Sequence, residues 1–147
     1  MTRLTAALLA AVLVSGPAIA TDADISQAAG GLQILDARDA DLEAFKWVAR
    51  PLVVFADTPN DPRFLDQMAM IEARPEMLAE RDVVVITDTD PAARSAVRER
   101  LRPRGFALVI IAKDGTVNMR KPTPWAVREI SHAIDKLPMR REEMRQR

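Results

Sequence analysis

The stretch RPLVVFA, residues 50–56, is an unbroken apolar run behind an Arg-Pro pair. Proline disfavours helical backbone in the residue before it, so the chain enters this run in an extended conformation. Two further runs, VVVI at residues 83–86 and ALVII at residues 107–111, have the same character. Such runs suit strands that are buried on both faces, and the first two predict a parallel pair joined by a helix. The sequence therefore predicts an α/β domain.

Helices and one hairpin connect these runs. Apolar residues at helical spacing predict helices over residues 63–81, interrupted at Pro75, and over residues 92–102 and 125–137. The Asp-Gly pair at 114–115 predicts a hairpin between strands 106–112 and 117–120. A right-handed crossover places the first two strands side by side, and the hairpin then extends the sheet beyond the first strand. The expected order is β-α-β-α-β-β-α, with a central four-stranded mixed sheet and flanking helices.

A capping residue followed by proline marks three expected helix starts, at Asp61-Pro62, Asp90-Pro91 and Thr123-Pro124. In such a pair the side-chain oxygen accepts a hydrogen bond from a free backbone N–H of the first turn. Proline fits the first helical position because its missing N–H has no partner there.

The first twenty residues have the pattern of a secretory signal peptide. Arg3 precedes an apolar core over residues 4–14, and Ala18-Ile19-Ala20 has the small residues of a cleavage site. The core is shorter than the ~20 residues that span a bilayer, which disfavours the alternative of an uncleaved anchor. We therefore expect an exported protein, periplasmic or extracellular, with no transmembrane segment after cleavage. Residues 21–41 predict a flexible leader, residues 42–138 the folded domain, and residues 139–147 a basic C-terminal tail.

Charge balance and cysteine content exclude several functions. The chain has 21 basic and 21 acidic residues, and removal of Arg3 with the signal leaves 20 against 21. A nearly neutral chain argues against nucleic acid as a partner. The chain has no cysteine. It therefore cannot carry out thiol–disulfide exchange, and its stability has to come from packing.

Together these motifs resemble a family of uncharacterised thioredoxin-like domains, found in bacterial exported proteins and in vertebrate sushi-repeat-containing and related extracellular matrix proteins. The resemblance rests on Trp47 with residues 50–56, Arg81-Asp82 before the second strand, Gly105-Phe106, Lys113-Asp114-Gly115 and residues 134–141. It covers roughly residues 42–141. It implies a thioredoxin- or peroxiredoxin-like fold without established catalysis, so it supplies no catalytic residues.

Two loops depart from the redox proteins of this fold. Residues 57–62 stand where those proteins have a cysteine pair, and residues 104–106 stand where they have a cis-proline that binds extended peptide. In open α/β sheets, ligands bind beyond the carboxyl ends of the strands. We therefore expect a binding site at this edge of the sheet, formed by Asp57, Thr58, Asn60, Asp61, Arg104 and Gly105.

Arginines predict a basic surface outside this edge. Arg94, Arg98 and Arg102 recur every four residues on the second expected helix, and Arg140 and Arg141 lie in the tail. Such residues either form a solvated helix face or bind phosphate and acidic groups.

The remaining titratable residues do not define a catalytic or metal site. Carboxylates near the loop edge could hold Mg²⁺ or Ca²⁺, but Asp61 and Asp90 are expected as helix caps, which leaves Asp57 and Asp88. Two ligands are too few, so we expect no metal and no cofactor. His132 is the only histidine. It is expected on the solvent side of the last helix, without a catalytic partner.

The sequence therefore favours an exported, non-redox binding or scaffold module whose partner is a protein or an envelope component. Two alternatives stay open: an enzyme, hydrolytic or cation-dependent, that uses the carboxylates and arginines of the same edge, and a structural envelope protein held by its tail. The surroundings of Asp57 distinguish the enzyme alternative from a binding module. An enzyme predicts that Asp57 lies in a concave pocket with a raised pKa or a second titratable group within hydrogen-bond reach.

Overall fold

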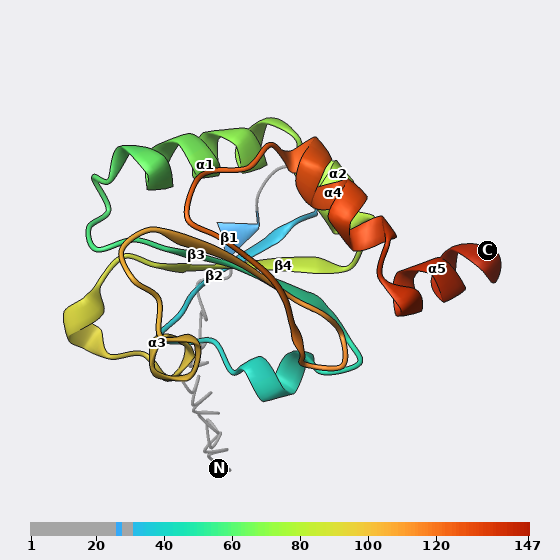
Figure 1. The fold of residues 1–147 in the computed structure, drawn as a ribbon, viewed down its shortest axis with the longest axis horizontal. Coiled ribbons are helices and arrows are strands. Elements are labelled where there is room, and N and C mark those ends of the chain that lie inside the picture. Colours follow the sequence, from blue (N-terminus) through green and yellow to red (C-terminus); the bar gives the residue numbers. More distant parts are fainter. Residues whose placement is uncertain (1–25, 28–30) are drawn as a thin grey trace, which may run out of the picture.

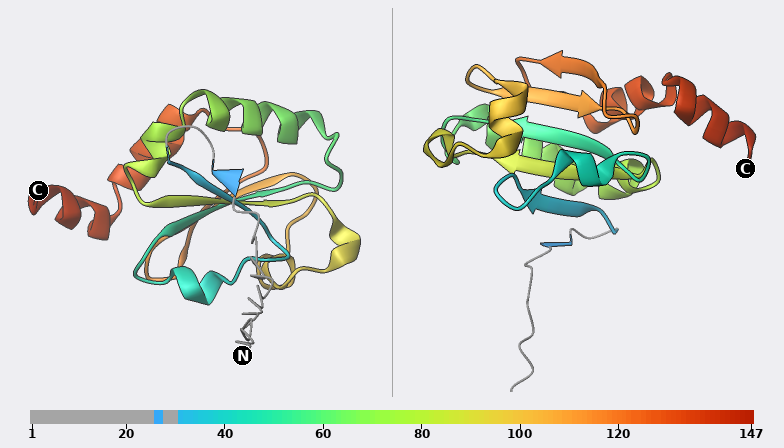
Figure 2. Two further views of the ribbon diagram at one scale, coloured as in Figure 1. Left: turned by 180° about the vertical axis from the view of Figure 1, so that it is seen from behind. Right: turned by 90° about the horizontal axis from the view of Figure 1, so that it is seen from below.

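The computed structural model describes residues 26–27 and 31–147. The expected signal peptide, residues 1–20, and the first part of the expected leader lie outside the described residues. The described chain forms one mixed sheet with helices on both faces, and a C-terminal helix extends away from the body (Figures 1 and 2).

The sheet has the strand order β1-β2-β4-β3-β5-β6. Its members are β1 (Ser26–Gln27), β2 (Gln33–Asp36), β3 (Arg50–Phe55), β4 (Val83–Asp88), β5 (Ala107–Ile111) and β6 (Val117–Lys121). Strands β2, β4 and β3 are parallel, whereas β5 and β6 form an antiparallel hairpin that joins the other side of β3. The predicted parallel pair, the hairpin and the α/β fold class are therefore confirmed.

Two strands that the sequence analysis did not predict make the sheet larger than expected. Residues 33–36 fall in the expected flexible leader, yet they form β2 and pair with β4, with Ile34 opposite Val85. Leu32 just before them is fully buried. The leader prediction is wrong here because the strand is short and only two of its four residues are apolar, so β4 and not local sequence stabilises it.

The two faces of the sheet follow from the alternation of side chains along β3. Leu52 and Val54 face the core beneath α1 (Pro62–Ala73), α2 (Pro75–Ala79) and α4 (Val127–Asp135). Val53 and Phe55 face the opposite core beneath η1 (Leu42–Phe45) and α3 (Ala96–Leu101). Figure 1 shows these two layers above and below the sheet. A strand covered on both faces needs apolar residues at every position, which explains the unbroken run.

The prolines divide the helices partly as predicted. Pro75 ends α1 and begins α2, and Asp61 caps α1 by accepting a hydrogen bond from the Arg63 N–H. The expected helix over residues 92–102 is wrong as one continuous element. It is a short 3-10 helix, η2 (Pro91–Ala93), followed by Arg94 in the left-handed region and then by α3, which Ser95 caps.

The expected cap at Thr123-Pro124 is also wrong, because α4 begins after Ala126. Gln67, fully buried on α1, explains the delay. Its amide donates to the Trp125 carbonyl at 3.0 Å and accepts from the Trp125 N–H at 2.8 Å. The Gln67 side chain thus satisfies both backbone polar groups of Trp125, which therefore do not need partners within α4.

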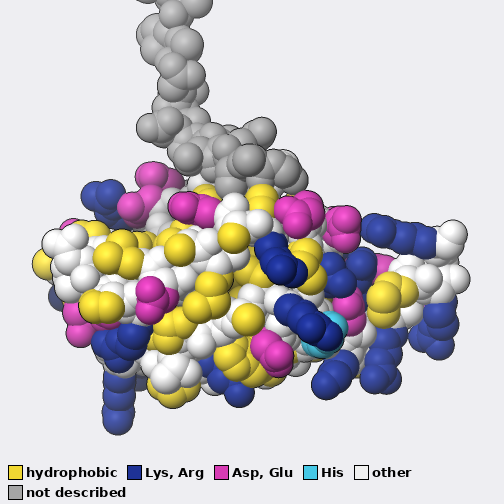
Figure 3. All heavy atoms as spheres, turned by 90° about the horizontal axis from the view of Figure 1, so that it is seen from above, with side chains coloured by type: hydrophobic (Ala, Val, Ile, Leu, Met, Phe, Trp, Pro, Cys, Tyr) yellow, Lys and Arg dark blue, Asp and Glu magenta, His cyan; other side chains and the backbone are white. Residues whose placement is uncertain are grey.

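The tail forms a helix of its own. Pro138 occupies the first turn of α5 (Pro138–Arg145), which projects from the body beyond α4 (Figure 2). Lys and Arg side chains gather at this end of the molecule (Figure 3).

Candidate functional site

Two loops meet beyond the carboxyl end of β3. The loop of residues 57–61 follows β3, and the loop of residues 102–106 precedes β5, whose first residue, Ala107, lies opposite Phe55. A Cβ atom added to Gly105, which has a φ of 61°, would lie 3.9 Å from Asp57 Oδ2. The structure therefore brings Asp57 and Gly105 together at one edge, with the exposed Arg104 beside them.

The loop after β3 is a turn that leaves its side chains exposed. The Asp61 N–H donates to the Thr58 carbonyl, and the Asn60 N–H donates to Thr58 Oγ1. Asp57, Thr58 and Asn60 are exposed. No hydrogen bond or ion pair involves the Asp57 side chain within residues 31–147.

Asp61 belongs to the scaffold more than to the exposed surface. Besides capping α1, its carboxylate accepts from Arg63 Nη2 at 2.8 Å. The hydrogen bond from Arg63 lowers the pKa of Asp61 below its ordinary value. The Arg63 guanidinium in turn lies 5.6 Å from the centre of the Phe106 ring, which joins α1 to the second loop. Asp61 is thus near the edge, but Arg63 occupies its oxygens.

Asp88 and Arg98 form a buried pair under the same edge. Arg98 donates to Asp88 Oδ1 from Nη2 at 2.8 Å and from Nε at 3.1 Å, and it also reaches the Ala56 carbonyl at 3.0 Å. Ser95 Oγ donates to Asp88 Oδ2 at 2.6 Å. The expectation that Arg98 lies on a basic surface is wrong, because the break at Arg94 turns α3 so that Arg98 faces the sheet.

The same pair removes Asp88 from the carboxylates that could bind a cation. In the described part of the chain, no three His, Asp or Glu side chains are placed to hold a metal ion. His132 lies exposed on α4.

The other arginines of the expected basic surface differ in their exposure to solvent. Arg94 and Arg102 are exposed, and Arg94 pairs with Glu99 at 3.2 Å. Arg141 is exposed on α5, but Arg140 is buried. The expectation for Arg140 is therefore wrong. Helical periodicity places it on the face of α5 that points back to the sheet, where carboxylates surround it.

A basic hollow lies beside the loop edge, where α3 ends and β6 ends. It has a volume of about 270 Å³, and four cationic side chains line it together with Pro103, Phe106, Ala107 and Pro122. The cations are Arg102, Arg104, Arg120 and Lys121. We call this site the basic hollow.

Two of these cations are held in place without a carboxylate. Arg120 donates to the Leu101 carbonyl at 2.7 Å, and the Lys121 ammonium lies 4.3 Å from the centre of the Trp125 ring. Among the residues that the structure describes, no ion pair involves any of the four cations. Sequence analysis identified Arg102 and Arg104 but missed Arg120 and Lys121. Their signal was the Arg-Lys-Pro sequence at the end of the second hairpin strand.

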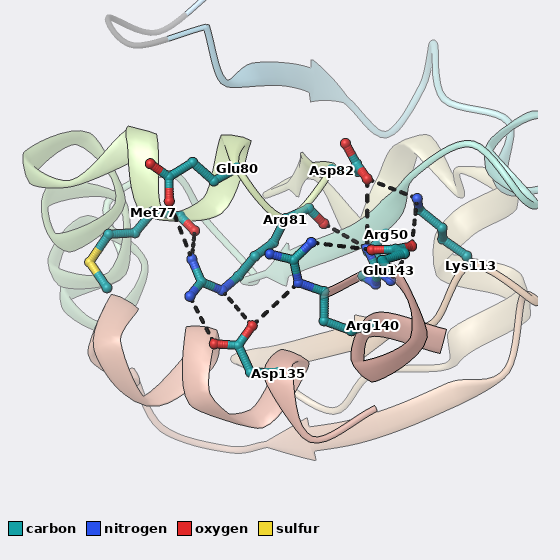
Figure 4. A network of polar contacts seen from close by, with 9 residues as sticks. All are labelled: Arg50, Met77, Glu80, Arg81, Asp82, Lys113, Asp135, Arg140 and Glu143. Atoms are coloured by element: carbon teal, nitrogen blue, oxygen red, sulfur yellow. Dashed lines mark hydrogen bonds and ion pairs between the residues drawn. The ribbon is translucent and has the colours of Figure 1, made fainter. Parts of the chain in front are cut away.

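The amino ends of β3 and β4 carry a second polar cluster, which we call the clamp (Figure 4). Its centre is Arg50, whose side chain is 1% exposed. Arg50 donates to the Arg81 carbonyl and to Glu143 Oε1, both at 2.8 Å. Lys113 reaches Glu143 at 2.9 Å and Asp82 at 2.8 Å. The clamp therefore ties the start of β3 and the β5–β6 hairpin to α5.

A second half of the clamp ties α4 and α5 to α2. Arg81 forms two hydrogen bonds to Asp135, at 3.0 and 2.8 Å, and Arg140 links Asp135 to Glu143. Burial by itself would raise the pKa of Glu143, but hydrogen bonds from Arg50, Lys113 and Arg140 lower it from 4.5 to about 2. Glu80 lies 3.9 Å from Arg81, so four cations face four carboxylates, and the clamp is a structural device.

The architecture is that of thioredoxin-like proteins. A reduced 2-Cys peroxiredoxin of Plasmodium vivax superposes with a TM-score of 0.57 at 13% identity, covering 71% of this chain and 85% of that one. Chloroplastic thioredoxin z superposes with a TM-score of 0.53 at 19% identity, covering 70% of this chain and 92% of that one. Desulfothioredoxin of Desulfovibrio vulgaris Hildenborough superposes with a TM-score of 0.51 at 20% identity, covering 71% of this chain and 97% of that one. At these identities the likeness shows the fold alone.

The sequence places the chain in a family. Residues 41–143 match the domain of unknown function DUF4174, so the chain belongs to that family. No curated protein matches the sequence. Within the described residues, no helix is long and apolar enough to cross a membrane.

Proposed function

We propose that the protein is an exported, non-redox binding module that holds a partner, a protein or another envelope component, at the loop edge. The observation that carries the proposal is the meeting of two loops, at Asp57 and Gly105, beside cations that form no ion pair with the carboxylates of the described residues. Without cysteine the edge cannot exchange disulfides. Exposed polar groups at the carboxyl ends of the strands remain suited to recognition.

Export rests on the sequence of residues 1–20, with its basic start, short apolar core and small residues at the cut. The resemblance to a domain of bacterial exported proteins and of vertebrate sushi-repeat proteins is consistent with export. In those vertebrate relatives the domain is part of adhesive, matrix-type proteins, which favours binding over catalysis.

The enzyme alternative has less support at Asp57. An enzyme at this edge predicts a second titratable group within hydrogen-bond reach of Asp57, and none reaches the Asp57 carboxylate within the described residues. Asp61 and Asp88, the nearby carboxylates, are held by Arg63 and Arg98. Asp90, which is also exposed, accepts from the Ala92 N–H as the cap of η2. Within the described residues, none of these carboxylates is therefore paired with Asp57 as acid and base.

A capture experiment tests the proposal. The protein, the double variant Asp57→Ala/Arg104→Ala and the matched control Arg128→Ala/Glu129→Ala, which alters two exposed residues of α4, are immobilised and exposed to cell-envelope extract. We expect the wild type and the control to retain the same component and the loop variant to lose at least most of it. Equal retention by all three proteins would contradict the proposal, and so would turnover of a substrate that depends on Asp57.

A further inference from the structure

The basic hollow opens at the end of an edge strand. β6 is the last strand in the sheet order, and it pairs only with β5. Besides that ladder, no backbone hydrogen bond within the described residues involves residues 118–121. The outer side of β6 therefore presents unpaired N–H and C=O groups, which can accept a further strand.

The charges along this edge decide which strand can be added. β6 ends in Arg120 and Lys121, and Arg102 and Arg104 lie across the hollow from them. A second copy of β6 carries the same two cations and no carboxylate, so pairing with it would add positive charge at this edge and neutralise none. An acidic strand would instead place its carboxylates among four cations that form no ion pair within the described part of the chain.

The hollow also supplies groups that hold a carboxylate in a defined place. Arg102 and Arg104 carry planar guanidinium groups, which bind carboxylates through two parallel hydrogen bonds. Arg120 is fixed by the Leu101 carbonyl and Lys121 by the Trp125 ring, so ordering these two side chains costs less on binding.

We propose that the outer edge of β6 and the basic hollow together bind an extended, acidic segment of a partner protein. This inference rests on the proposed function and names the chemistry of its partner. Backbone hydrogen bonds to β6 supply affinity, and the cations of the hollow select segments rich in Asp and Glu.

The test uses a short, end-capped peptide of alternating glutamate and valine, titrated into the purified protein by calorimetry. A second peptide has proline in place of valine, which keeps the charge, removes every second backbone N–H and fixes the proline φ away from strand values. The variant Arg102→Gln/Lys121→Gln removes two cations of the hollow and leaves Asp57 and Arg104 intact. The matched control Arg141→Gln/Arg147→Gln removes two exposed cations of the C-terminal region.

We expect the glutamate–valine peptide to bind, the hollow variant to bind it about tenfold more weakly, and the control to bind it as the wild type does. Higher salt should weaken binding, and slower amide hydrogen exchange should appear in residues 117–121. Equal affinity for the proline peptide, or equal weakening by the control, would overturn the inference. Preference for inorganic phosphate or for anionic lipid vesicles at the same cations would overturn it as well.

The two proposals fail in different ways. If capture from envelope extract depends on Asp57 and Arg104 while Arg102→Gln/Lys121→Gln changes nothing, the loop edge binds a partner and the acidic-strand inference is wrong. If neither variant affects capture, the proposed function itself fails.

Discussion

Glu143 tests whether the clamp holds α5 to the domain. The change is Glu143→Gln, which removes the charge and keeps the shape. In the folded protein the carboxylate accepts from Arg50 at 2.8 Å, and it lies 2.9 Å from Lys113 and 3.2 Å from Arg140. These bonds hold its pKa at about 2 instead of 4.5.

The magnitude follows from that difference in pKa. Taken in full, a drop from 4.5 to about 2 corresponds to about 3 kcal/mol of stability. The Glu143 side chain is 25% exposed, so solvent screening reduces the effect to about 1–2 kcal/mol. The variant also leaves the buried Arg50 with the more distant Asp82, at 3.9 Å, as its remaining carboxylate, which keeps the loss from being smaller.

The stability that Glu143 contributes should depend on pH in a defined direction. Because the folded-state pKa is lowered, the stabilisation is present above pH 4.5 and is lost as the pH falls towards 2. Urea denaturation of both proteins at a series of pH values should show a gap of about 1–2 kcal/mol at pH 7. The gap should close at the acid end, where the wild-type side chain is also neutral.

The neighbouring Glu142 supplies the control. It is exposed, and within the described residues its carboxylate accepts from Arg145 on the same helix and from Gln146 at the end of that helix. Glu142→Gln should change the free energy of unfolding by less than about 0.5 kcal/mol at any pH. A gap for Glu143→Gln that does not vary with pH, or one no larger than that of Glu142→Gln, would refute the assignment of the clamp as a stabilising device.

Two further substitutions address the body of the domain. Arg98→Met leaves the buried Asp88 without its cation and should lower the free energy of unfolding by about 3 kcal/mol in denaturation experiments. The control Arg94→Met removes an exposed ion pair and should lower it by less than about 0.5 kcal/mol. Similar losses for both variants would show that Arg98 is not needed to neutralise Asp88. Trp47 is 68% exposed and has a φ of 65°, a conformation that glycine adopts without strain. Trp47→Gly should therefore raise the free energy of unfolding by about 0.5–1 kcal/mol. The control Val48→Gly, at a residue without a positive φ, should lower it by about the same amount. A loss for Trp47→Gly would mean that its ring stabilises the fold.

The central strands could be predicted because local sequence and tertiary position require the same residues. β3, β4 and β5 are covered on both faces, so each contains an unbroken apolar run, over residues 51–55, 83–86 and 107–111. The hairpin could be predicted because Asp-Gly suits its turn, where Gly115 has a φ of 86°. β2 could not, because a short strand of mixed composition depends on pairing with β4, which the local pattern does not encode.

The exposure of the arginines was harder to predict than the elements that carry them. The helical spacing of Arg94, Arg98 and Arg102 implies one shared face only if the helix is continuous, and Arg94 in the left-handed region breaks it. Arg140 is buried because Asp135 and Glu143 lie beside it, and Glu143 is placed there by Arg50, far away in the sequence. Burial of a charge depends on such distant partners, which periodicity cannot show.

The two ends of the sheet differ in whether their charges are already paired. At the clamp, every cation lies within 4 Å of a carboxylate, and several of these residues belong to the stretches that carry the family resemblance. An acidic partner there would have to displace a carboxylate that already pairs with these cations, and it would gain little. In the basic hollow the cations have no carboxylate to displace within the described chain, so an acidic partner gains the whole interaction. The same reasoning gives the paired charges at the amino ends of β3 and β4 a role in stability, and it supports the proposal that the opposite edge serves recognition.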